Sequence, residues 1–304
     1  MLSAVSLHLP ELVALQQQAR MLRLRPTRQA AAFSGAHRSR VRGRGMEFDE
    51  VRHYQVGDDI STLDWKVTAR KGSPHIKLFR EERERPLLLC LDYRPSMMFA
   101  TRGRLKAVQA SYLAALIAWA GIARGDRLGG LIFSRNGHQE LRPARGKKAV
   151  LQWLYRCCEA DVWSQARQTM GEQDDKLFLS LLRLRRLAHP GTTVAIISDF
   201  RALDRRCQQQ LQLLARHCEC LLCHVFDPLE RQLPDQRQYR VHDGHDAFVM
   251  DGSDDRLRQQ VNQHFSTLSE QLTALCRHER LHLLSLETRD DPVTALKNSG
   301  WWQA

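Results

Sequence analysis

The chain has 304 residues, of which 43% are hydrophobic, and its formal net charge is +12. This length suits one or two domains, and this hydrophobic content suffices for a folded core, which excludes a largely disordered chain. The longest apolar run, residues 112–123, is too short for a bilayer span of about 20 residues, and glutamines at 16–18 interrupt any secretory signal, so we expect a cytoplasmic protein without a membrane span.

The positive charge is concentrated near the start of the sequence. Residues 1–24 have a helical character, and eight arginines without an acid lie between Arg20 and Arg44. We therefore predict an N-terminal helix and a basic arm over residues 1–42. Such an arm can bind an acidic protein, a membrane surface or nucleic acid, or it can pack on acidic residues of its own chain. Because every predicted core strand begins after Pro86, we expect the remaining chain to fold without residues 1–42.

A polar segment, residues 43–85, follows the arm. It mixes aromatic and charged residues in a way that is typical of protein interfaces. The residues that we expect to contact a partner are Tyr54, Asp58, Asp59, Asp64, Trp65 and Arg70. For Trp65 the alternative is that it buries against the sheet, since large aromatic side chains are mostly buried.

From Pro86 onward, apolar runs alternate with segments of helical periodicity. Continuous apolar runs are typical of strands that are buried on both faces of a parallel sheet, and here they occur at residues 87–91, 127–133, 192–198, 220–226 and 281–286. The helical segments are residues 104–123, 147–159, 173–188, 204–217, 254–278 and 292–298, and a short strand is expected at 237–242. Residues 86–304 are thus predicted to form an α/β domain with a doubly wound, mostly parallel sheet.

Three of the predicted strands are followed by an aspartate: Asp92, Asp199 and Asp227. Doubly wound sheets bind ligands at the carboxyl ends of their strands, where the strand order reverses. A single aspartate at such a position carries little information, because aspartate also favours turns and helix caps. Three of them, with the hydroxyl of Ser96 nearby, indicate a functional edge.

An ordered series of short motifs resembles a bacterial family known as domain of unknown function 58. The motifs are Gly45-Met46-Glu47-Phe48, Arg52-His53-Tyr54, Gly57-Asp58-Asp59, Asp64-Trp65-Lys66, Ala69-Arg70, Glu81-Glu82, Ser198-Asp199-Phe200 and Asp227-Pro228-Leu229-Glu230. The resemblance implies a sheet of von Willebrand factor A type. It also implies association with a MoxR-type AAA+ ATPase, in a chaperone-like role that matures other protein complexes.

In von Willebrand A domains, a metal-ion-dependent adhesion site uses Asp-x-Ser-x-Ser, a threonine and a late aspartate. The resemblance assigns Asp92 and Ser96 to the first motif and Asp199 to the late aspartate, but Arg94 stands where the middle serine belongs. The threonine has no secure counterpart, since Thr169 is the nearest and Asp174 and Asp175 lie closer to the next helix. The site is therefore predicted to be degraded.

Arg94 decides what we expect at this site. A guanidinium has no acceptor and cannot ligate a cation, but it can bind carboxylates bidentately. We therefore predict that Arg94 pairs with Asp92 and Asp199 at N···O distances of about 2.7–2.9 Å, and no cofactor is expected. The alternative is that Arg94 turns to solvent and Mg²⁺ binds through Asp92, Ser96, Asp199 and water.

The function predicted from the sequence is a non-enzymatic interaction and assembly factor. No Gly-x-Ser-x-Gly elbow and no complete phosphate-binding loop are present, so no catalytic residues are assigned. Two alternatives remain open: a nucleic-acid-binding protein that uses Arg20–Arg44, and a metal-dependent hydrolase that uses the strand-edge aspartates.

Overall fold

The computed structural model describes residues 4–24, 46–81, 86–160, 163, 175–235, 238–242, 247–277 and 280–303. The chain forms two compact units. The larger unit, which we call the body, comprises Met1–Arg25 and Arg85–Ala304, and the smaller unit comprises Pro26–Glu84. Each unit is described by itself.

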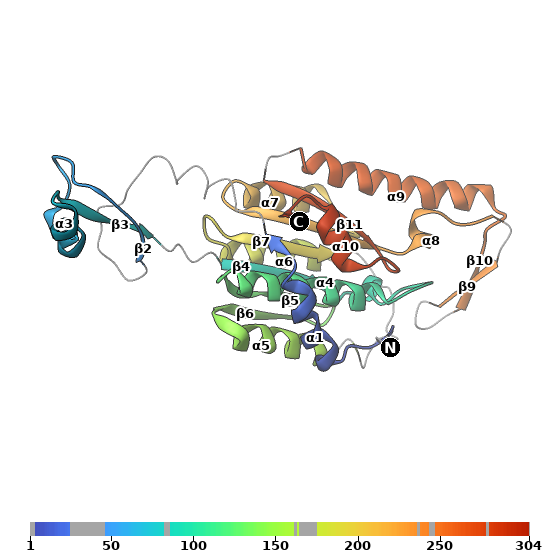
Figure 1. The fold of residues 1–304 in the computed structure, drawn as a ribbon. Helices are drawn as coiled ribbons and strands as arrows, with labels where there is room; N and C mark the ends of the chain where they lie inside the picture. The colour runs from blue at the N-terminus through green and yellow to red at the C-terminus, as the bar shows by residue number, and fades with distance from the viewer. Residues whose placement is uncertain are drawn as a thin grey trace. The chain divides into compact units, whose positions relative to one another are not determined.

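A six-stranded sheet forms the centre of the body (Figure 1). Its strands lie in the order β11 (Leu281–Glu287), β8 (Glu219–Phe226), β7 (Thr193–Ser198), β4 (Pro86–Asp92), β5 (Arg127–Phe133) and β6 (His138–Ala144). All neighbours are parallel except β6, which runs antiparallel to β5. The chain builds outward from β4 to β6 and then returns to β7 on the other side of β4. The strand order therefore reverses between β4 and β7, where such sheets form their binding crevices.

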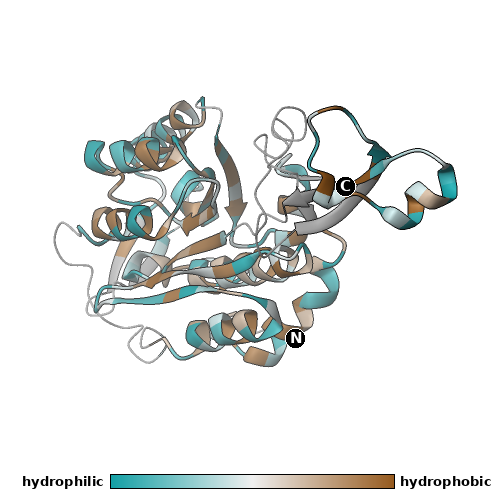
Figure 2. Ribbon diagram, turned by 90° about the vertical axis from the view of Figure 1, so that its left-hand side faces the viewer, coloured by the Kyte–Doolittle hydropathy of each residue, from teal (hydrophilic) through white to brown (hydrophobic). Residues whose placement is uncertain are grey.

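Helices cover both faces of this sheet, as predicted. One face carries α1 (Leu9–Ala19), α4 (Lys106–Ala123), α5 (Gly146–Cys158) and α10 (Pro292–Asn298). The other carries α6 (Lys176–Leu187), α7 (Arg205–Ala215) and α9 (Asp255–Leu275). Within β4, Leu87, Leu89 and Leu91 face the first layer and Leu88 and Cys90 face the second, because successive strand side chains point to opposite faces. Figure 2 shows hydrophobic segments both on the central strands and on the helices that cover them.

Three smaller elements complete the body. Two are short antiparallel pairs, β1 (Arg23–Leu24) with β12 (Trp302–Gln303), and β9 (Gln238–His242) with β10 (Ala247–Asp251). The third is the single-turn helix α8 (Pro228–Arg231), which follows β8 directly.

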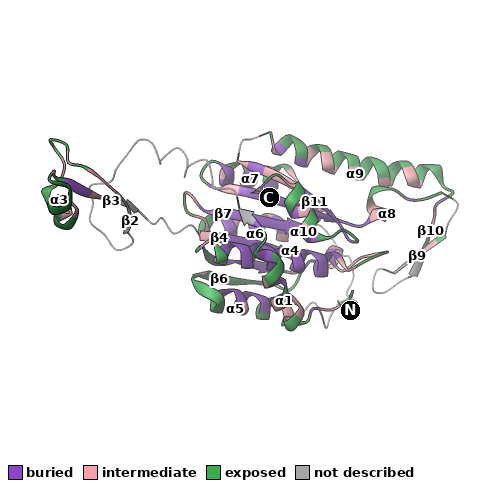
Figure 3. Ribbon diagram, viewed as in Figure 1, coloured by how far each residue is buried: buried purple, intermediate pink, exposed green. Residues whose placement is uncertain are grey.

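Helix α4 is the central helix of the body. Within the described part of the chain it is the one helix that is long and apolar enough to cross a membrane by length and composition, and 89% of that stretch is buried. Figure 3 shows it buried along most of its length. Its apolar character thus matches its position between the sheet and helices α1 and α5.

Helix α1 is part of the body, which corrects the predicted boundary at residue 42. Leu12, Leu15 and Ala19 are buried in the same core as α4. The indole nitrogen of Trp119 donates to the backbone oxygen of Leu12 at 3.0 Å, and the Tyr112 hydroxyl donates to Glu11. We therefore no longer expect the body to keep its stability without residues 1–42. Residues 25–42 of the predicted arm lie outside the described residues.

The smaller unit is described over residues 46–81. Strands β2 (Met46–His53) and β3 (His75–Glu81) form an antiparallel pair, and the 3-10 turn η1 (Ile60–Thr62) and helix α3 (Trp65–Lys71) connect them. Among its described side chains only His75 and Ile76 are buried. This unit ends at Glu84, close to the predicted boundary at residue 85, but its strands were not predicted.

The packing of α1 gives a test of the corrected boundary. Leu12→Ala should lower the free energy of unfolding by about 2–5 kcal/mol, because it leaves a cavity between α1 and α4. Urea denaturation measures this loss. Gln18→Ala, on the exposed side of the same helix, is the matched control and should change stability little. A Leu12→Ala protein as stable as wild type would show that α1 is dispensable.

Candidate functional site

Four neighbouring parallel strands end in an acidic residue at the same edge of the sheet. Asp92 ends β4, Asp199 follows β7, Asp227 follows β8 and Glu287 ends β11. All four residues are at most 5% exposed. The sequence predicted the three aspartates, but Glu287 was missed, although it directly follows a predicted strand. Buried carboxylates at this density need partners, because an uncompensated buried charge is costly.

Arg94 is the partner of Asp92. Its Nη2 lies 2.7 Å from Asp92 Oδ2, and its Nε lies 3.0 and 3.1 Å from the two oxygens. The Arg94 backbone nitrogen donates to Oδ1 at 2.9 Å, and the Ser198 hydroxyl donates to Oδ2 at 2.6 Å. The predicted contact is therefore confirmed for Asp92. It is looser for Asp199, whose Oδ1 lies 3.5 Å from Arg94 Nη2.

Lys106 is the main partner of Asp199. It is the first residue of α4, is fully buried, and places its Nζ 3.0 Å from Asp199 Oδ2. Burial raises the pKa of Asp199, but the charges of Lys106, Arg94 and Arg201 outweigh burial and hold that pKa well below its usual value. Asp199 is therefore ionised over the whole physiological range.

Glu230 joins the same network from α8. Its Oε1 accepts from Lys106 Nζ at 2.6 Å and from Arg201 Nη2 at 2.9 Å. Its Oε2 accepts from the backbone nitrogen of Asp227 at 2.9 Å. The network thus contains three carboxylates and three cations, namely Asp92, Asp199 and Glu230 with Arg94, Lys106 and Arg201. It is balanced in charge without any added ion.

The residues present do not fit the magnesium site that was the alternative prediction. Mg²⁺ needs carboxylate and hydroxyl oxygens with free lone pairs, yet the oxygens of Asp92 accept from Arg94 and Ser198. The half-buried Ser96, in the turn η2 (Pro95–Met97), makes no hydrogen bond with any described residue. Within the described ranges no cluster of three His, Cys, Asp or Glu could hold a metal. Thr169 and Asp174 lie outside those ranges, and Asp175 pairs with Arg206 at 2.5 Å on the surface.

The loop after β7 is held in an unusual conformation. Phe200 and Ala202, with φ of 52° and 66°, are the two non-glycine residues of the described chain with positive φ. Such conformations cost about 1–3 kcal/mol and persist where the surroundings fix them. Here the Ser198 hydroxyl accepts from Phe200 N at 2.9 Å, and the backbone oxygen of Arg201 accepts from Arg94 Nη1 at 3.0 Å. The strained loop therefore fixes Arg201 at the point where the strand order reverses.

Asp227 has a structural role at this edge. Its carboxylate accepts from the backbone nitrogen and the hydroxyl of Thr101, at 2.8 and 2.5 Å. It also accepts from the Thr288 hydroxyl at 3.0 Å and caps α8 through Leu229 N at 3.0 Å. Asp227 thereby ties the loop before α4 to the ends of β8 and β11.

The acidic motif residues of the smaller unit shape its turns. Asp58 pairs with Arg52 at 2.7 Å, Asp59 caps η1, and Asp64 caps α3 by accepting from Lys66 N and Val67 N. Their conspicuous spacing in the sequence thus reflects turn and capping geometry.

The other predicted contact residues of this unit remain accessible to different degrees. Trp65 is 70% exposed on its own unit, and the alternative that it packs against the sheet of the body stays a prediction. Arg70 is exposed and Tyr54 is half-buried. That a partner contacts Tyr54, Asp58, Asp59, Asp64, Trp65 and Arg70 stays a prediction.

Comparison with known proteins finds similarity to uncharacterised proteins. A model of the family described as "Protein of unknown function DUF58" matches residues 50–271. The uncharacterized proteins Mb1516 of Mycobacterium bovis and Rv1480 of Mycobacterium tuberculosis are each 32% identical over 222 residues, which cover 73% of this chain and 68% of theirs. Among solved structures, the conserved hypothetical protein BatB from Bacteroides thetaiotaomicron aligns with a TM-score of 0.43 and 12% identity, over 71% of this chain and 96% of that chain.

The lowered pKa of Asp199 predicts how the stability of the body depends on pH. The carboxyl has a pKa of about 3.9 when unfolded and a lower one when folded, so its contribution is complete above pH 4–5 and is lost as pH falls through the folded pKa. Asp199→Asn should therefore cost about 3–5 kcal/mol at neutral pH, and the cost should shrink at acidic pH. Urea denaturation from pH 7 to pH 3 measures the difference.

Glu270→Gln, at an exposed position of α9, is the control for this experiment and should show little cost at any pH. A cost of Asp199→Asn that stays constant, or grows toward acid, would contradict the assigned ion pairs.

Proposed function

Because this chain belongs to the family described as protein of unknown function DUF58, we propose that it is a non-enzymatic interaction and assembly factor built on a von Willebrand factor A-like sheet. The observation that carries the proposal is the buried pair between Arg94 and Asp92. It supplies a cation from the chain itself at the position where an adhesion site of this type holds its metal. The edge keeps the layout of a binding site and has no need of an added ion.

The state of the titratable groups favours binding over catalysis. A general base or a metal ligand must have a free lone pair, whereas Asp92 and Asp199 accept from Arg94, Lys106 and Ser198. Burial lowers the pKa of His224 to about 4, so this histidine is neutral at physiological pH. A general acid or base works best with a pKa near the pH at which it operates, and His224 does not have one. These features weigh against the metal-dependent hydrolase.

The strand order and the place of the three motif residues support the von Willebrand A assignment. Asp92, Ser96 and Asp199 all lie at the carboxyl edge, beside the reversal between β4 and β7. The proposed partner is a MoxR-type AAA+ ATPase in the cytoplasm, and its support is the family resemblance together with the accessible Trp65. Exposed tryptophans are among the commonest residues to dominate the energy of an interface.

Affinity capture from the native host tests the proposed partner. Full-length protein used as bait in moderate salt should retain a MoxR-type ATPase, identified by mass spectrometry. Trp65→Ala should reduce the captured amount about ten-fold, the loss expected from an interface hot spot. Because Trp65 is 70% exposed, the variant should unfold at the same urea concentration as wild type.

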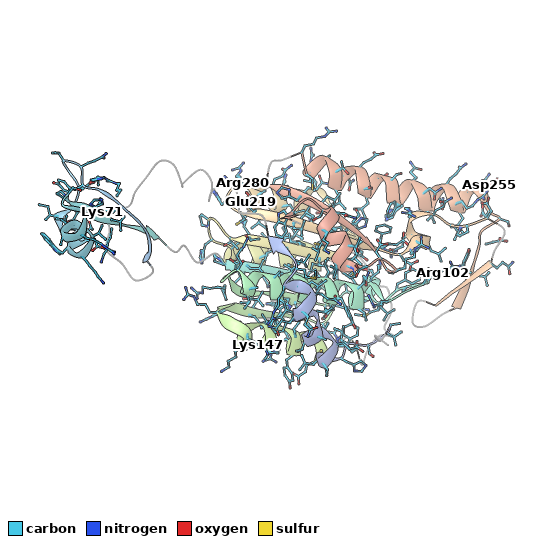
Figure 4. The ribbon with its side chains drawn as sticks, viewed as in Figure 1. Lys71, Arg102, Lys147, Glu219, Asp255 and Arg280 are labelled. Atoms are coloured by element: carbon cyan, nitrogen blue, oxygen red, sulfur yellow. The ribbon has the colours of Figure 1, made fainter. Side chains whose placement is uncertain are left out.

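Lys71→Ala is the matched control, since Lys71 is exposed on the same helix as Trp65 and is labelled in Figure 4. It should leave capture unchanged. Repeated captures that contain no such ATPase would refute the proposed partner, and equal losses for both variants would refute the role of Trp65.

A further inference from the structure

Each of the four strands that end in a buried acid is also followed by an arginine that reaches the surface. Arg102 follows β4 and η2, Arg201 follows β7, Arg231 closes α8 after β8, and Arg289 follows β11. These strands are neighbours in the sheet, so the four arginines, which we call the arginine row, lie along one edge. Figure 4 shows Arg102 at the opposite end of the sheet from Glu219 and Arg280, which lie where β8 and β11 begin.

Burial separates the two kinds of charge at this edge. The acids at the strand ends are at most 5% exposed, whereas the side chains of Arg201, Arg231 and Arg289 are 40%, 51% and 53% exposed. Arg231 and Arg289 share the single carboxylate of Glu287, and Arg102 is exposed and forms no ion pair with a described residue. The surface of the edge thus presents the donors of Arg102, together with those donors of Arg201, Arg231 and Arg289 that Glu230 and Glu287 do not occupy.

The exposed acids near the row are engaged in local structure. Asp290 accepts from the backbone nitrogen of Glu287, and Asp291 caps α10. Asp204 caps α7 and pairs with Arg206. None of these contacts involves the row; Arg201 pairs instead with Glu230, and Arg231 with Glu287.

The backbone at Arg102 and Arg201 is held in place by neighbouring contacts. Thr101 binds Asp227 through its backbone and its hydroxyl, and Arg104 N donates to Thr288 O at 3.1 Å, so Arg102 lies between two anchors. A Cβ at Gly103 would collide with the backbone of Thr288, which fixes the close approach of this loop. Arg201 is fixed by its strained neighbours and by Glu230. Arginines that are ordered before binding lose less entropy when a ligand arrives.

We propose that the arginine row binds acidic side chains of a partner protein. The inference rests on the proposed interaction function and names the chemistry of its ligand. In a metal-dependent adhesion site a partner's carboxylate completes the coordination of the cation; here guanidinium groups receive the carboxylate directly. Their planar fork matches a carboxylate with two parallel hydrogen bonds. A segment with several Asp or Glu residues fits a row that spans four adjacent strands about 4.8 Å apart.

Titration of a labelled peptide tests the proposal on the full-length chain. A fluorescein-labelled peptide of alternating glycine and glutamate is the probe, and its glutamine counterpart is the uncharged reference. Fluorescence anisotropy should show that wild type prefers the glutamate peptide. Arg102→Gln/Arg231→Gln should weaken its binding roughly five-fold, as expected for two exposed arginine–carboxylate pairs. Glu287 keeps Arg289 in this variant, so the fold should be retained.

Lys147→Gln/Lys148→Gln is the charge-matched control. Both lysines are exposed at the start of α5. This helix follows the antiparallel strand β6, so it begins at the edge where the parallel strands start, opposite the edge that carries the arginine row. Figure 4 shows Lys147 well apart from Arg102. This control should change affinity less than about two-fold. Equal losses in both variants, or none in either, would refute the proposal. Such a result, together with continued capture of the ATPase, would leave the proposed function standing.

Two further measurements complete the test. The single variant Arg102→Gln removes no contact with a described residue, so it should keep the stability of wild type. It should still bind the glutamate peptide more weakly than wild type, and it therefore tests the row even if the double variant is destabilised. A labelled oligothymidine should bind more weakly than the glutamate peptide and should be insensitive to Arg102→Gln/Arg231→Gln. Tighter oligothymidine binding that depends on the row would identify nucleic acid as the ligand and overturn the proposal.

Discussion

The ion pair between Arg94 and Asp92 is the interaction on which the functional edge depends. Asp92 is fully buried at the end of a central strand, where an unpaired carboxylate would cost several kcal/mol. Arg94, two residues later, supplies the compensating charge. Its guanidinium also donates to the backbone oxygen of Arg201 and so holds that residue in place. Lys106 extends the same compensation to Asp199, and Lys106 and Arg201 together compensate Glu230. The result is a charge-balanced network to which Arg201 contributes from the surface.

The topology of the sheet explains why this network lies where it does. The strand order reverses between β4 and β7, so no crossover connection covers the gap between their carboxyl ends. Side chains from distant parts of the sequence can therefore meet there, as Lys106 and Glu230 do across 124 positions. The smaller unit carries the longest run of family motifs, but its acidic residues mainly shape turns, and Trp65 is a large aromatic side chain that it leaves exposed.

Much of the body could be predicted from the sequence, because five core strands are continuous apolar runs and Asp92-Tyr93-Arg94 places a guanidinium beside a carboxylate. Strand β6 was missed because its residues are mostly polar and exposed, as suits an antiparallel edge strand. Lys106 was missed as an ion-pair partner because a lysine at the start of a helix is usually solvated. The packing of α1 was missed because every predicted core strand begins after Pro86, which suggested that the preceding residues were dispensable. The misses of Lys106 and of α1 concern contacts between residues that are distant in the sequence.

Calorimetric titration of Mg²⁺ tests the central claim, that Arg94 replaces a metal ion at this edge, most directly. Wild type should give no binding heat at millimolar concentrations, because the oxygens of Asp92 already accept from Arg94 and Ser198. Arg94→Ser restores the hydroxyl of an adhesion motif and frees Asp92 and Asp199, so this variant should bind Mg²⁺. Tight binding to wild type that persists unchanged in Arg94→Ser would contradict the account.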